Sequence, residues 1–326
     1  MKSLLEGVKR KWGFLKSQEG FRKAPMLTAI HLISWVLRCS LRKAAVLNLR
    51  RWNVRMCLPP QWRGFGKYIF AFRENYEPEL LYLEKLLSPG STFVDVGANM
   101  GIYTLVASRL VGEAGHVIAF EPSAQSFSLL RRNIALNSLT NVIALPEALS
   151  NETGRTKLFH GPDPVCNSLG RDLSWDGDAE EVATETLDDV LRRTSLRRVN
   201  AIKIDVEGAE ELVLRGALNT LTCMRPAIVF EINPGACSCL GLSPHGATEL
   251  LQSLGYSCFV VGQRGTAFRL DSPPGYFNVL AIPNNCKEFP NGLSQILSTK
   301  VNANQERLDI SECSDTCQLG APSNNT

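Results

Sequence analysis

Residues 92–101 read Thr-Phe-Val-Asp-Val-Gly-Ala-Asn-Met-Gly, and this stretch decides the fold. It opens with a short apolar run that predicts a buried strand, and residues 102–110 continue with the spacing of an amphipathic helix. Gly97 and Gly101 fall between the two, where glycine permits a tight turn and lets a ligand approach the backbone without a Cβ in the way. Ligands of open α/β sheets bind at the carboxyl ends of the strands. The stretch therefore predicts a strand, a ligand-binding turn and a helix.

The same alternation of strand and helix continues along the chain. Further apolar runs predict strands at 116–120, 141–145, 201–205 and 226–231, and helical spacing recurs at 126–137, 186–191, 210–221 and 248–254. Near-continuous apolar strands that alternate with helices predict an α/β fold, a mostly parallel, Rossmann-like sheet with helices on both faces. The last two runs, 257–261 and 277–282, have no helix between them, so we expect an antiparallel hairpin at one edge of the sheet.

The second predicted strand ends in Glu121, about twenty residues after the glycine-containing turn. A carboxylate in this place can accept hydrogen bonds from the hydroxyls of a ribose. The glycines stand four residues apart, which differs from the dinucleotide fingerprint, and no lysine follows them as it does in a P-loop. We therefore interpret Asp95, Gly97, Asn99 and Gly101, together with Glu121, as a binding site for a nucleoside cofactor.

Five stretches carry a resemblance to a known family. They are FVDVGANMG at 93–101, AFEP at 119–122, EALSN at 147–151, IKIDVEGAE at 202–210 and IVFE at 228–231. With them the chain resembles the FkbM family of S-adenosylmethionine-dependent methyltransferases over roughly residues 70 to 285. The one departure is Met100, where isoleucine is commoner, and this swap nearly conserves the side-chain volume.

The resemblance implies a class I methyltransferase fold, with a seven-stranded sheet whose last strand is antiparallel. It also implies S-adenosylmethionine as the cofactor. Gly97, Asn99 and Gly101 would border its methionine part, Glu121 would bind its ribose, and Glu147 with Ala148 would flank its adenine. Characterised relatives, as a group, methylate hydroxyls on sugars and polyketide-type metabolites. The resemblance thus implies an O-methyltransferase with a sugar, glycan or small-molecule acceptor.

Methyl transfer to a hydroxyl needs a base or a metal ion, because a protonated alcohol is a poor nucleophile. The candidate catalytic residues at the end of the fourth predicted strand are Lys203, Asp205 and Glu207. Burying Lys203 unpaired between isoleucines would be costly, so we expect it to pair with a carboxylate, Asp205 or Glu231. Three roles stay open for Asp205: general base, Mg²⁺ ligand together with Glu231 or Asn233, and member of an ion-paired network that only supports the site.

A long insertion follows the third predicted strand. His160 lies in a Gly- and Pro-containing segment that we interpret as an exposed loop over the edge of the sheet, and it is an alternative base. The loop continues to 167–169, where we expect a substrate lid. Trp175, Asp176 and Asp178 in the same insertion either shape the acceptor specificity or face solvent.

The basic residues of the chain are concentrated at its N-terminal end. The net charge is only +3, but residues 1–51 contain twelve Lys and Arg against two acids. The apolar stretch at 26–37 is too short for a transmembrane helix, which takes roughly twenty apolar residues. We expect a helix that packs on the domain with its charges outward. The alternatives are peripheral contact of residues 1–50 with an anionic membrane and contact with RNA, for which no aromatic-basic motif is present.

The domain organisation predicted from these patterns has three parts. Residues 1–60 form a basic helical extension, 61–290 the methyltransferase domain, and 291–326 a polar, disordered tail. Residues 1–25 are studded with charge and do not read as a signal peptide. Ten cysteines without zinc-ribbon spacing indicate free thiols, so we expect a cytoplasmic protein.

Two further functions are consistent with the same motifs. One is a non-catalytic module that has kept the cofactor pocket, against which the intact Asp205 and Glu207 argue. The other is an RNA or protein methyltransferase guided by the basic arm. The chain lacks the Asn/Asp-Pro-Pro-Tyr/Phe tetrapeptide of amino-group methyltransferases, so we do not expect a nucleic-acid partner.

Overall fold

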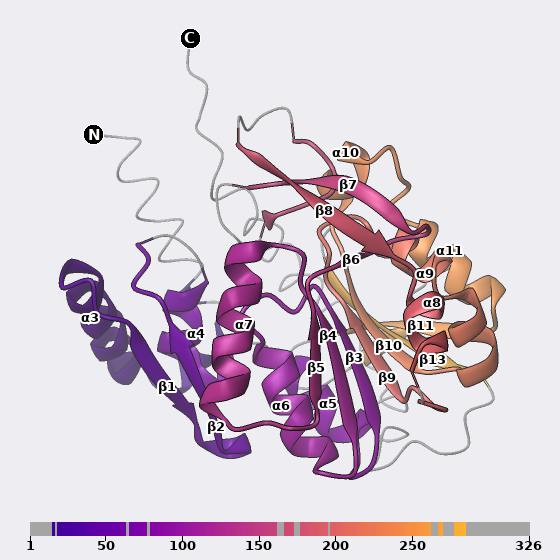
Figure 1. The fold of residues 1–326 in the computed structure, drawn as a ribbon. Coiled ribbons are helices and arrows are strands. Elements are labelled where there is room, and N and C mark those ends of the chain that lie inside the picture. Colours follow the sequence, from indigo (N-terminus) through magenta and orange to yellow (C-terminus); the bar gives the residue numbers. More distant parts are fainter. Residues whose placement is uncertain are drawn as a thin grey trace.

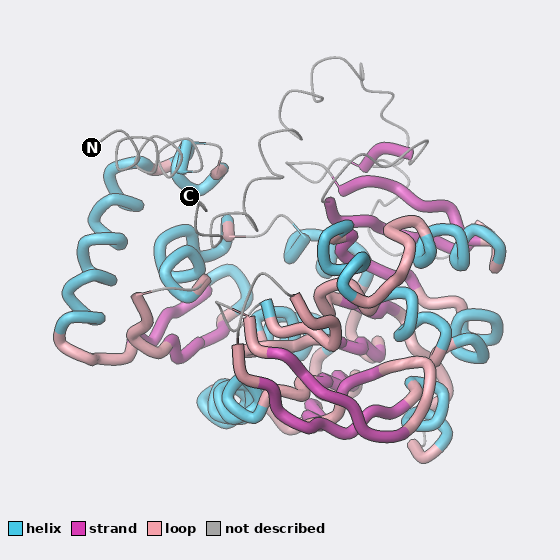
Figure 2. The backbone as a smooth tube through the Cα atoms, turned by 90° about the horizontal axis from the view of Figure 1, so that it is seen from above, coloured by secondary structure: helices cyan, strands magenta, loops and turns pink. Residues whose placement is uncertain are grey.

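The computed structural model describes residues 15–16, 18–62, 65–76, 79–161, 166–172, 177–194, 196–261, 267–269 and 277–284. The tail predicted at 291–326 lies outside these ranges, as do Trp175 and Asp176 of the insertion. Figures 1 and 2 show a central sheet with helices on both faces, an N-terminal unit on one side, and a small sheet over one end.

The central sheet has eight strands in the order β12-β11-β13-β10-β9-β3-β4-β5. Its parallel strands are β3 (Thr92–Val96), β4 (His116–Phe120), β5 (Val142–Leu145), β9 (Ala201–Ile204) and β10 (Ala227–Ile232). β13 (Phe277–Pro283) runs antiparallel between β10 and β11 (Tyr256–Val261), and the short β12 (Ala267–Arg269) pairs with β11. The expected α/β fold, a mostly parallel sheet with an antiparallel last strand, is confirmed. β12 adds an eighth strand.

The predicted terminal hairpin is correct in its pairing and wrong in its position. β11 and β13 pair antiparallel, but β13 lies inside the sheet and not at its edge. Successive strand residues point to opposite faces of a sheet. Val279, Leu280 and Ala281 are all fully buried, so both faces of β13 are covered, as they are in an interior strand.

Helices cover the two faces of the sheet. One face carries α5 (Glu79–Leu86), α6 (Ile102–Val111) and α7 (Ala124–Leu136), and the other carries α8 (Leu187–Arg192), α9 (Glu210–Arg215) and α11 (Gly246–Ser253). Alternate residues of β3 belong to two separate cores. Phe93 packs in one core with Leu105 of α6, and Val94 packs in the other with Leu214 of α9. The side chain of Asp95 therefore points toward α6.

α9 is shorter than the helix predicted at 210–221. It ends at Arg215, and a π-helical turn at Thr220–Met224 follows. Glycine weakens a helix at Gly216, and a Cβ there would lie 2.0 Å from the carbonyl oxygen of Ser150. The backbones of the two segments thus meet at the point where the helix ends.

The N-terminal unit is helical only in part. It contains α2 (Glu19–Lys23), α3 (Pro25–Ser40) and α4 (Gly66–Phe72), but also a hairpin of β1 (Ala45–Leu49) and β2 (Val54–Leu58) that the sequence pattern did not predict. The hairpin is fastened to α7: the backbone N–H of Cys57 donates to Asn133 Oδ1 at 2.7 Å, and that of Arg55 donates to Asn137 Oδ1 at 2.7 Å. Its apolar side chains join the same core as α5 and α6.

The insertion predicted as a loop contains a second sheet. β6 (Ala148–Leu149), β7 (Gly154–Phe159) and β8 (Ala179–Glu185) pair in the order β6-β8-β7. β8 was missed because charged residues interrupt it, and only Val182 and Thr184 are buried. Figure 1 shows this small sheet above the central one.

The cysteines within the described ranges are free thiols, as predicted. Burial raises the pKa of Cys237 to about 11 and that of Cys258 to about 12. A thiol is nucleophilic only after deprotonation, so these two side chains act as apolar packing groups.

Candidate functional site

The turn after β3 can only be built with glycine at two positions. Gly97 has φ +77°, and a Cβ on it would lie 1.9 Å from the carbonyl oxygen of Asp205. Gly101 has φ +93°, precedes α6, and has Leu130 Cδ1 2.5 Å from where its Cβ would be. A side chain at either position would combine a strained backbone with a steric clash. The turn after β3 is thus in close contact with Asp205, which follows β9, and with α7.

Asp95 lies beneath this turn and does not line the cavity above it. It is fully buried, and Thr104 Oγ1 of α6 donates to its Oδ2 at 2.5 Å. Burial raises the pKa of Asp95 above its usual value. Its observed role is to tie the end of β3 to the first turns of α6.

Glu121 joins the turn to the end of β4. Its Oε2 accepts from the backbone N–H of Asn99 at 2.7 Å, and its Oε1 accepts from that of Ser123 at 2.9 Å. Only 7% of the residue is exposed, and this burial raises the pKa of the carboxyl to about 7 although both hydrogen bonds favour the charged form. The two elements on which the sequence prediction depended therefore lie in direct contact.

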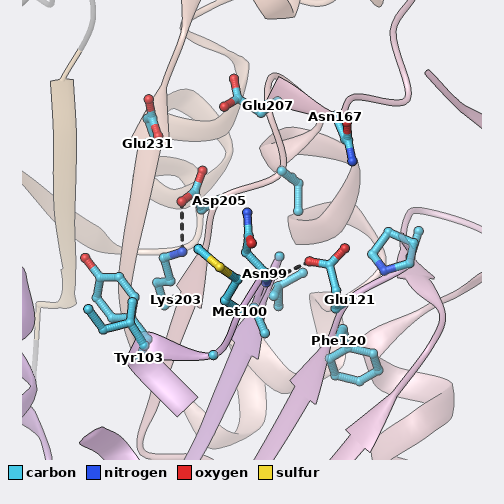
Figure 3. A pocket seen from close by; sticks show the side chains of 18 of the residues that line it. Asn99, Met100, Tyr103, Phe120, Glu121, Asn167, Lys203, Asp205, Glu207 and Glu231 are labelled. Carbon is cyan, nitrogen blue, oxygen red and sulfur yellow. Dashed lines mark hydrogen bonds and ion pairs between the residues drawn. The ribbon is translucent and has the colours of Figure 1, made fainter. Parts of the chain in front are cut away.

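One cavity contains nearly all the predicted cofactor residues. Gly97, Asn99, Gly101, Glu121, Glu147 and Ala148 line it, whereas Asp95 does not. The cavity continues past the turn to the predicted catalytic residues Lys203, Asp205 and Glu207, and to Glu231. Figure 3 shows Glu121 on one side of Asn99, with Lys203, Asp205 and Glu231 on the other. The cavity thus has two ends. We call the side with Glu121 the Glu121 end, and the side with Lys203, Asp205 and Glu231 the acidic end.

Lys203 is paired as predicted. Its Nζ lies 2.8 Å from Asp205 Oδ2 and 4.5 Å from the ring centroid of Tyr103, and the residue is only 7% exposed. A buried ammonium is stabilised by a carboxylate partner and by the face of an aromatic ring. Lys203 therefore holds the Asp205 carboxylate at one position on the cavity wall.

Glu231 is a further carboxyl group of the cavity wall. Burial raises the pKa of its carboxyl well above the usual value, and the nearby charges of Asp205, Glu207 and Glu210 raise it further. Its Oε1 is buried and has no hydrogen-bond partner within the described residues. A side-chain hydrogen bond with Asp205 raises the pKa of Glu231 as well, so its surroundings favour the neutral carboxyl over the carboxylate.

Glu207 adopts a left-handed backbone, φ +51°, which is uncommon for a residue with a side chain. Two contacts hold it there. Ser168 Oγ donates to its carbonyl oxygen at 2.7 Å, and Asn233 Nδ2 donates to its Oε2 at 3.1 Å. Such conformations persist only where the surrounding structure fixes them.

The metal alternative combined Asp205 with Glu231 or Asn233, and of these three residues only Asp205 and Glu231 line the cavity. Within the described part of the chain, no three His, Cys, Asp or Glu side chains are grouped closely enough to hold a metal ion. Asn233 does not line the cavity. Its Oδ1 caps α10 (Pro234–Cys239) by accepting from the backbone N–H of Ala236 at 3.1 Å.

The insertion reaches the cavity where a lid was expected. Asn167 and Leu169 line it, and the residue between them, Ser168, is the one bonded to Glu207. His160 does not line the cavity, and its Nε2 faces Glu180 at 3.5 Å. The structure thus places the alternative base away from the site.

One wall of the cavity was not predicted from the sequence. Met56, Phe65, Ile69 and Tyr76 line it from the N-terminal unit, with the rings of Phe65 and Tyr76 edge to face at 6.2 Å. Two signals were present in the sequence: the Tyr-Glu-Pro-Glu stretch at 76–79, which fits the usual lead-in of the family, and the density of aromatic residues at 65–72, which a buried helix would also show. Met56, Phe65 and Ile69 of this apolar wall belong to none of the sequence motifs.

The chain matches a known protein family over the part that contains most of this site. A family model described as the methyltransferase FkbM domain matches residues 95–258, half of the 326-residue chain. The chain belongs to the FkbM methyltransferase family. The resemblance drawn from the sequence motifs is therefore confirmed. The FkbM match begins at Asp95, so the apolar wall of Met56, Phe65, Ile69 and Tyr76 lies before it.

Three curated relatives are similar over most of their own length. The chain is 34% identical to methyltransferase sdnD of Sordaria araneosa, over 45% of this chain and 68% of that protein. It is 29% identical to the hexuronic acid methyltransferase AglP of Haloferax volcanii, over 52% and 69%. It is 30% identical to the 31-O-demethyl-FK506 methyltransferase FkbM of Streptomyces tacrolimicus, over 46% and 69%.

Proposed function

We propose that this chain is an S-adenosylmethionine-dependent O-methyltransferase that acts on a hydroxyl of a sugar or small metabolite. Membership of the FkbM family supports the methyl-transfer chemistry. One relative is named for a hexuronic acid and another for a 31-O-demethyl compound, and both names fit a hydroxyl-bearing acceptor. The observation that carries the proposal is a single cavity with the backbone-held Glu121 on one side and Asp205 on the other.

The Glu121 end fits a bound adenosyl group. The glycines at 97 and 101 leave the backbone open to a ligand, and the Glu121 carboxylate lines the cavity, where its remaining lone pairs can accept hydrogen bonds from the two ribose hydroxyls. Glu147 and Ala148 line the same cavity and would flank the adenine. When bound, S-adenosylmethionine supplies a methyl group activated by a positively charged sulfur.

The acidic end fits an acceptor hydroxyl. Asp205 can take the hydroxyl proton as the oxygen is methylated, and the ammonium of Lys203 at 2.8 Å keeps that carboxylate in position. Glu231 lines the cavity beside this pair, where its carboxyl can form a hydrogen bond that orients the acceptor. Asn167, Leu169 and the apolar wall line the cavity, and with both ligands bound they would limit the access of water to the reacting groups.

A labelled-methyl assay tests the proposal. The wild-type protein is incubated with methyl-labelled S-adenosylmethionine and a panel of uronic acids, glycosides and polyol metabolites, with O-methylated analogues as blocked acceptors. We expect label in an ether product from at least one free hydroxyl. Asp205→Asn should lower kcat by roughly 10²–10⁴-fold because the proton acceptor is lost, while cofactor affinity stays nearly unchanged.

Glu181→Gln is the matched control. Glu181 is an exposed carboxylate of β8, paired with Arg155 and outside the cavity, so this change should leave kcat unaltered. Equal losses in Asp205→Asn and Glu181→Gln would remove the assigned role of Asp205. Cofactor binding without any labelled product would instead support a module that binds and does not transfer.

A further inference from the structure

The outward face of α3 is apolar along its whole length. Met26, Ile30, Ile33, Leu37 and Leu41 follow one another at intervals of four, three, four and four residues, which places them on one side of a helix. They are exposed by 80%, 58%, 62%, 58% and 63%. A helix on the surface of a globular domain normally turns such a stripe toward the core.

The orientation of α3 is fixed by its opposite face. Trp35 is buried, its Nε1 donates to the carbonyl oxygen of Gln61 at 3.0 Å, and its ring lies 5.4 Å from that of Phe70. His31 Nδ1 lies 3.1 Å from the carbonyl oxygen of Ala71. The apolar stripe therefore cannot rotate inward without breaking this packing. Figures 1 and 2 both show α3 at the outer edge of the molecule.

Exposed apolar side chains are concentrated here. Of the eleven large hydrophobic residues that are exposed in the described chain, seven fall within 26–41. Single exposed apolar residues are ordinary, but a contiguous patch marks an interaction surface. Trp62 is 60% exposed and directly follows Gln61, the residue to which Trp35 is bonded. Tryptophan is enriched where membrane meets water.

Exposed basic residues flank the stripe at both ends. Arg22 and Lys23 are exposed just before the helix, and Arg42 and Lys43 just after it. Across residues 18–62 the sequence contains one acid, Glu19. The stripe is therefore apolar along its length and basic at both ends, which complements a surface of acyl chains bordered by anionic headgroups.

We propose that α3 docks this protein on the surface of an anionic lipid bilayer. The helix lies in the plane of the interface, with the stripe from Met26 to Leu41 facing the acyl chains and the exposed bases Arg42 and Lys43 contacting lipid phosphates. It does not cross the bilayer: α3 has 16 residues, or about 24 Å, and none of the helices in the described chain has the length and apolarity for a membrane span.

A second copy of the chain fits the stripe less well. Two copies packed by this face would bring the exposed bases Arg42 and Lys43 of each close to the same charges of the other. Like charges opposed across an interface disfavour association. An anionic bilayer satisfies both the apolar stripe and its basic ends.

Vesicle flotation tests the proposal with the full-length chain. We expect binding to phosphatidylcholine vesicles that contain phosphatidylserine, weaker binding to phosphatidylcholine alone, and release at high salt. Ile30→Gln/Ile33→Gln should lower the affinity for both vesicles about tenfold or more. Arg42→Gln/Lys43→Gln should lower it about tenfold on the anionic vesicles only.

Ile143→Gln/Leu218→Gln is the matched control. These two residues are 48% and 42% exposed and lie away from α3, so the variant removes similar apolar surface and should bind vesicles like the wild type. The proposal is overturned if the wild type does not bind vesicles, or if Ile30→Gln/Ile33→Gln and Ile143→Gln/Leu218→Gln lose equal affinity. A sedimentation-velocity dimer that Ile30→Gln/Ile33→Gln dissociates also overturns it. None of these readouts depends on methyl transfer.

Discussion

The two ends of the cavity are built in different ways. The Glu121 end is made largely from one continuous stretch, from the end of β3 to the start of α7, where backbone N–H groups hold the Glu121 carboxyl, and Glu147 and Ala148 add to it. The acidic end is built from the side chains of Lys203, Asp205 and Glu231, and the cavity also takes Met56, Phe65 and Asn167 from segments far from these in the chain. Backbone-built sites impose strict residue choices, whereas a wall of side chains tolerates many apolar residues.

Each end of the cavity has a turn that is held by a buried carboxyl group: Glu121 holds the turn after β3, and Glu210 holds the turn after β9. Glu121 accepts from the backbone at Asn99 and Ser123. Glu210 Oε1 accepts from the backbone N–H groups of Val206 and Gly208 at 3.1 and 3.3 Å. Burial raises the pKa of both carboxyls to about 7. The difference is that Glu121 lines the cavity and Glu210 does not, so only Glu121 can act on a ligand directly.

The largest expected effect is that of Gly97→Ala. Its Cβ would lie 1.9 Å from the Asp205 carbonyl oxygen, so β3 and β9 must separate. We expect the free energy of unfolding to fall by roughly 3 kcal/mol or more, with loss of cofactor binding. Gly112→Ala is the control, since Gly112 also has a positive φ, +65°, but nothing within 4 Å of its Cβ position. It should cost about 1 kcal/mol in urea unfolding. Similar losses in both variants would contradict the close contact of turn and strand.

Glu210→Gln tests how the Glu210 carboxyl stabilises the turn after β9, where it accepts from the backbone N–H groups of Val206 and Gly208. The folded-state pKa of Glu210, about 7, lies above its unfolded value, so this group stabilises the fold fully below pH 4.5 and that contribution is lost as pH rises through 7. Glutamine keeps the accepting oxygen and does not ionise. We expect Glu210→Gln to be more stable than the wild type at pH 8, by about 1–3 kcal/mol, and no more stable at pH 5. A variant that loses stability at pH 8 would show that the charge itself is needed.

The pH dependence of cofactor affinity tests Glu121. The ionised carboxylate is the form that accepts ribose hydroxyls, and its pKa is about 7. Affinity for S-adenosylmethionine should therefore be full above pH 7 and weaken roughly tenfold as pH falls from 8 to 6. In Glu121→Gln the affinity should be low and nearly independent of pH over this range. Calorimetric titrations that give parallel pH profiles for the two proteins would remove the carboxylate from the binding site.

The smallest expected effect is that of Phe65→Ala at the apolar wall. Removal of one ring should raise the KM for the acceptor by about three- to tenfold through lost apolar contact. The dissociation constant for S-adenosylmethionine should change by less than about twofold, because the Glu121 end is built elsewhere. Steady-state kinetics and calorimetry separate the two. An equal loss of cofactor and acceptor affinity would show that the two ends are not independent.

The sequence predicted the parts whose chemistry depends on specific residues at fixed spacing. The glycines of the first turn, Glu121, and the Lys203–Asp205 pair were all found where expected. The interior position of β13 was not predicted, because an apolar run does not tell a central strand from its neighbour at the edge.

The apolar wall and the small sheet of the insertion also escaped prediction. Phe65 and Ile69 have the spacing of an ordinary buried helix, and charged residues interrupt the alternation of β8. Asp95 was placed in the cofactor site because it stands beside the glycines, whereas its side chain turns away from the cavity toward Thr104. A residue next to the glycines in sequence need not face the cavity, because the register of the strand in the sheet decides to which face each side chain points.

The central claim is that the turn after β3 and the acid closing β4 receive an adenosyl group. A crystal structure of the protein with S-adenosylhomocysteine tests it most directly. We expect both ribose hydroxyls within hydrogen-bond distance of the Glu121 carboxylate, the adenine beside Glu147 and Ala148, and the sulfur facing Asp205. An adenosyl group bound outside this cavity, or a ribose turned away from Glu121, would contradict the account.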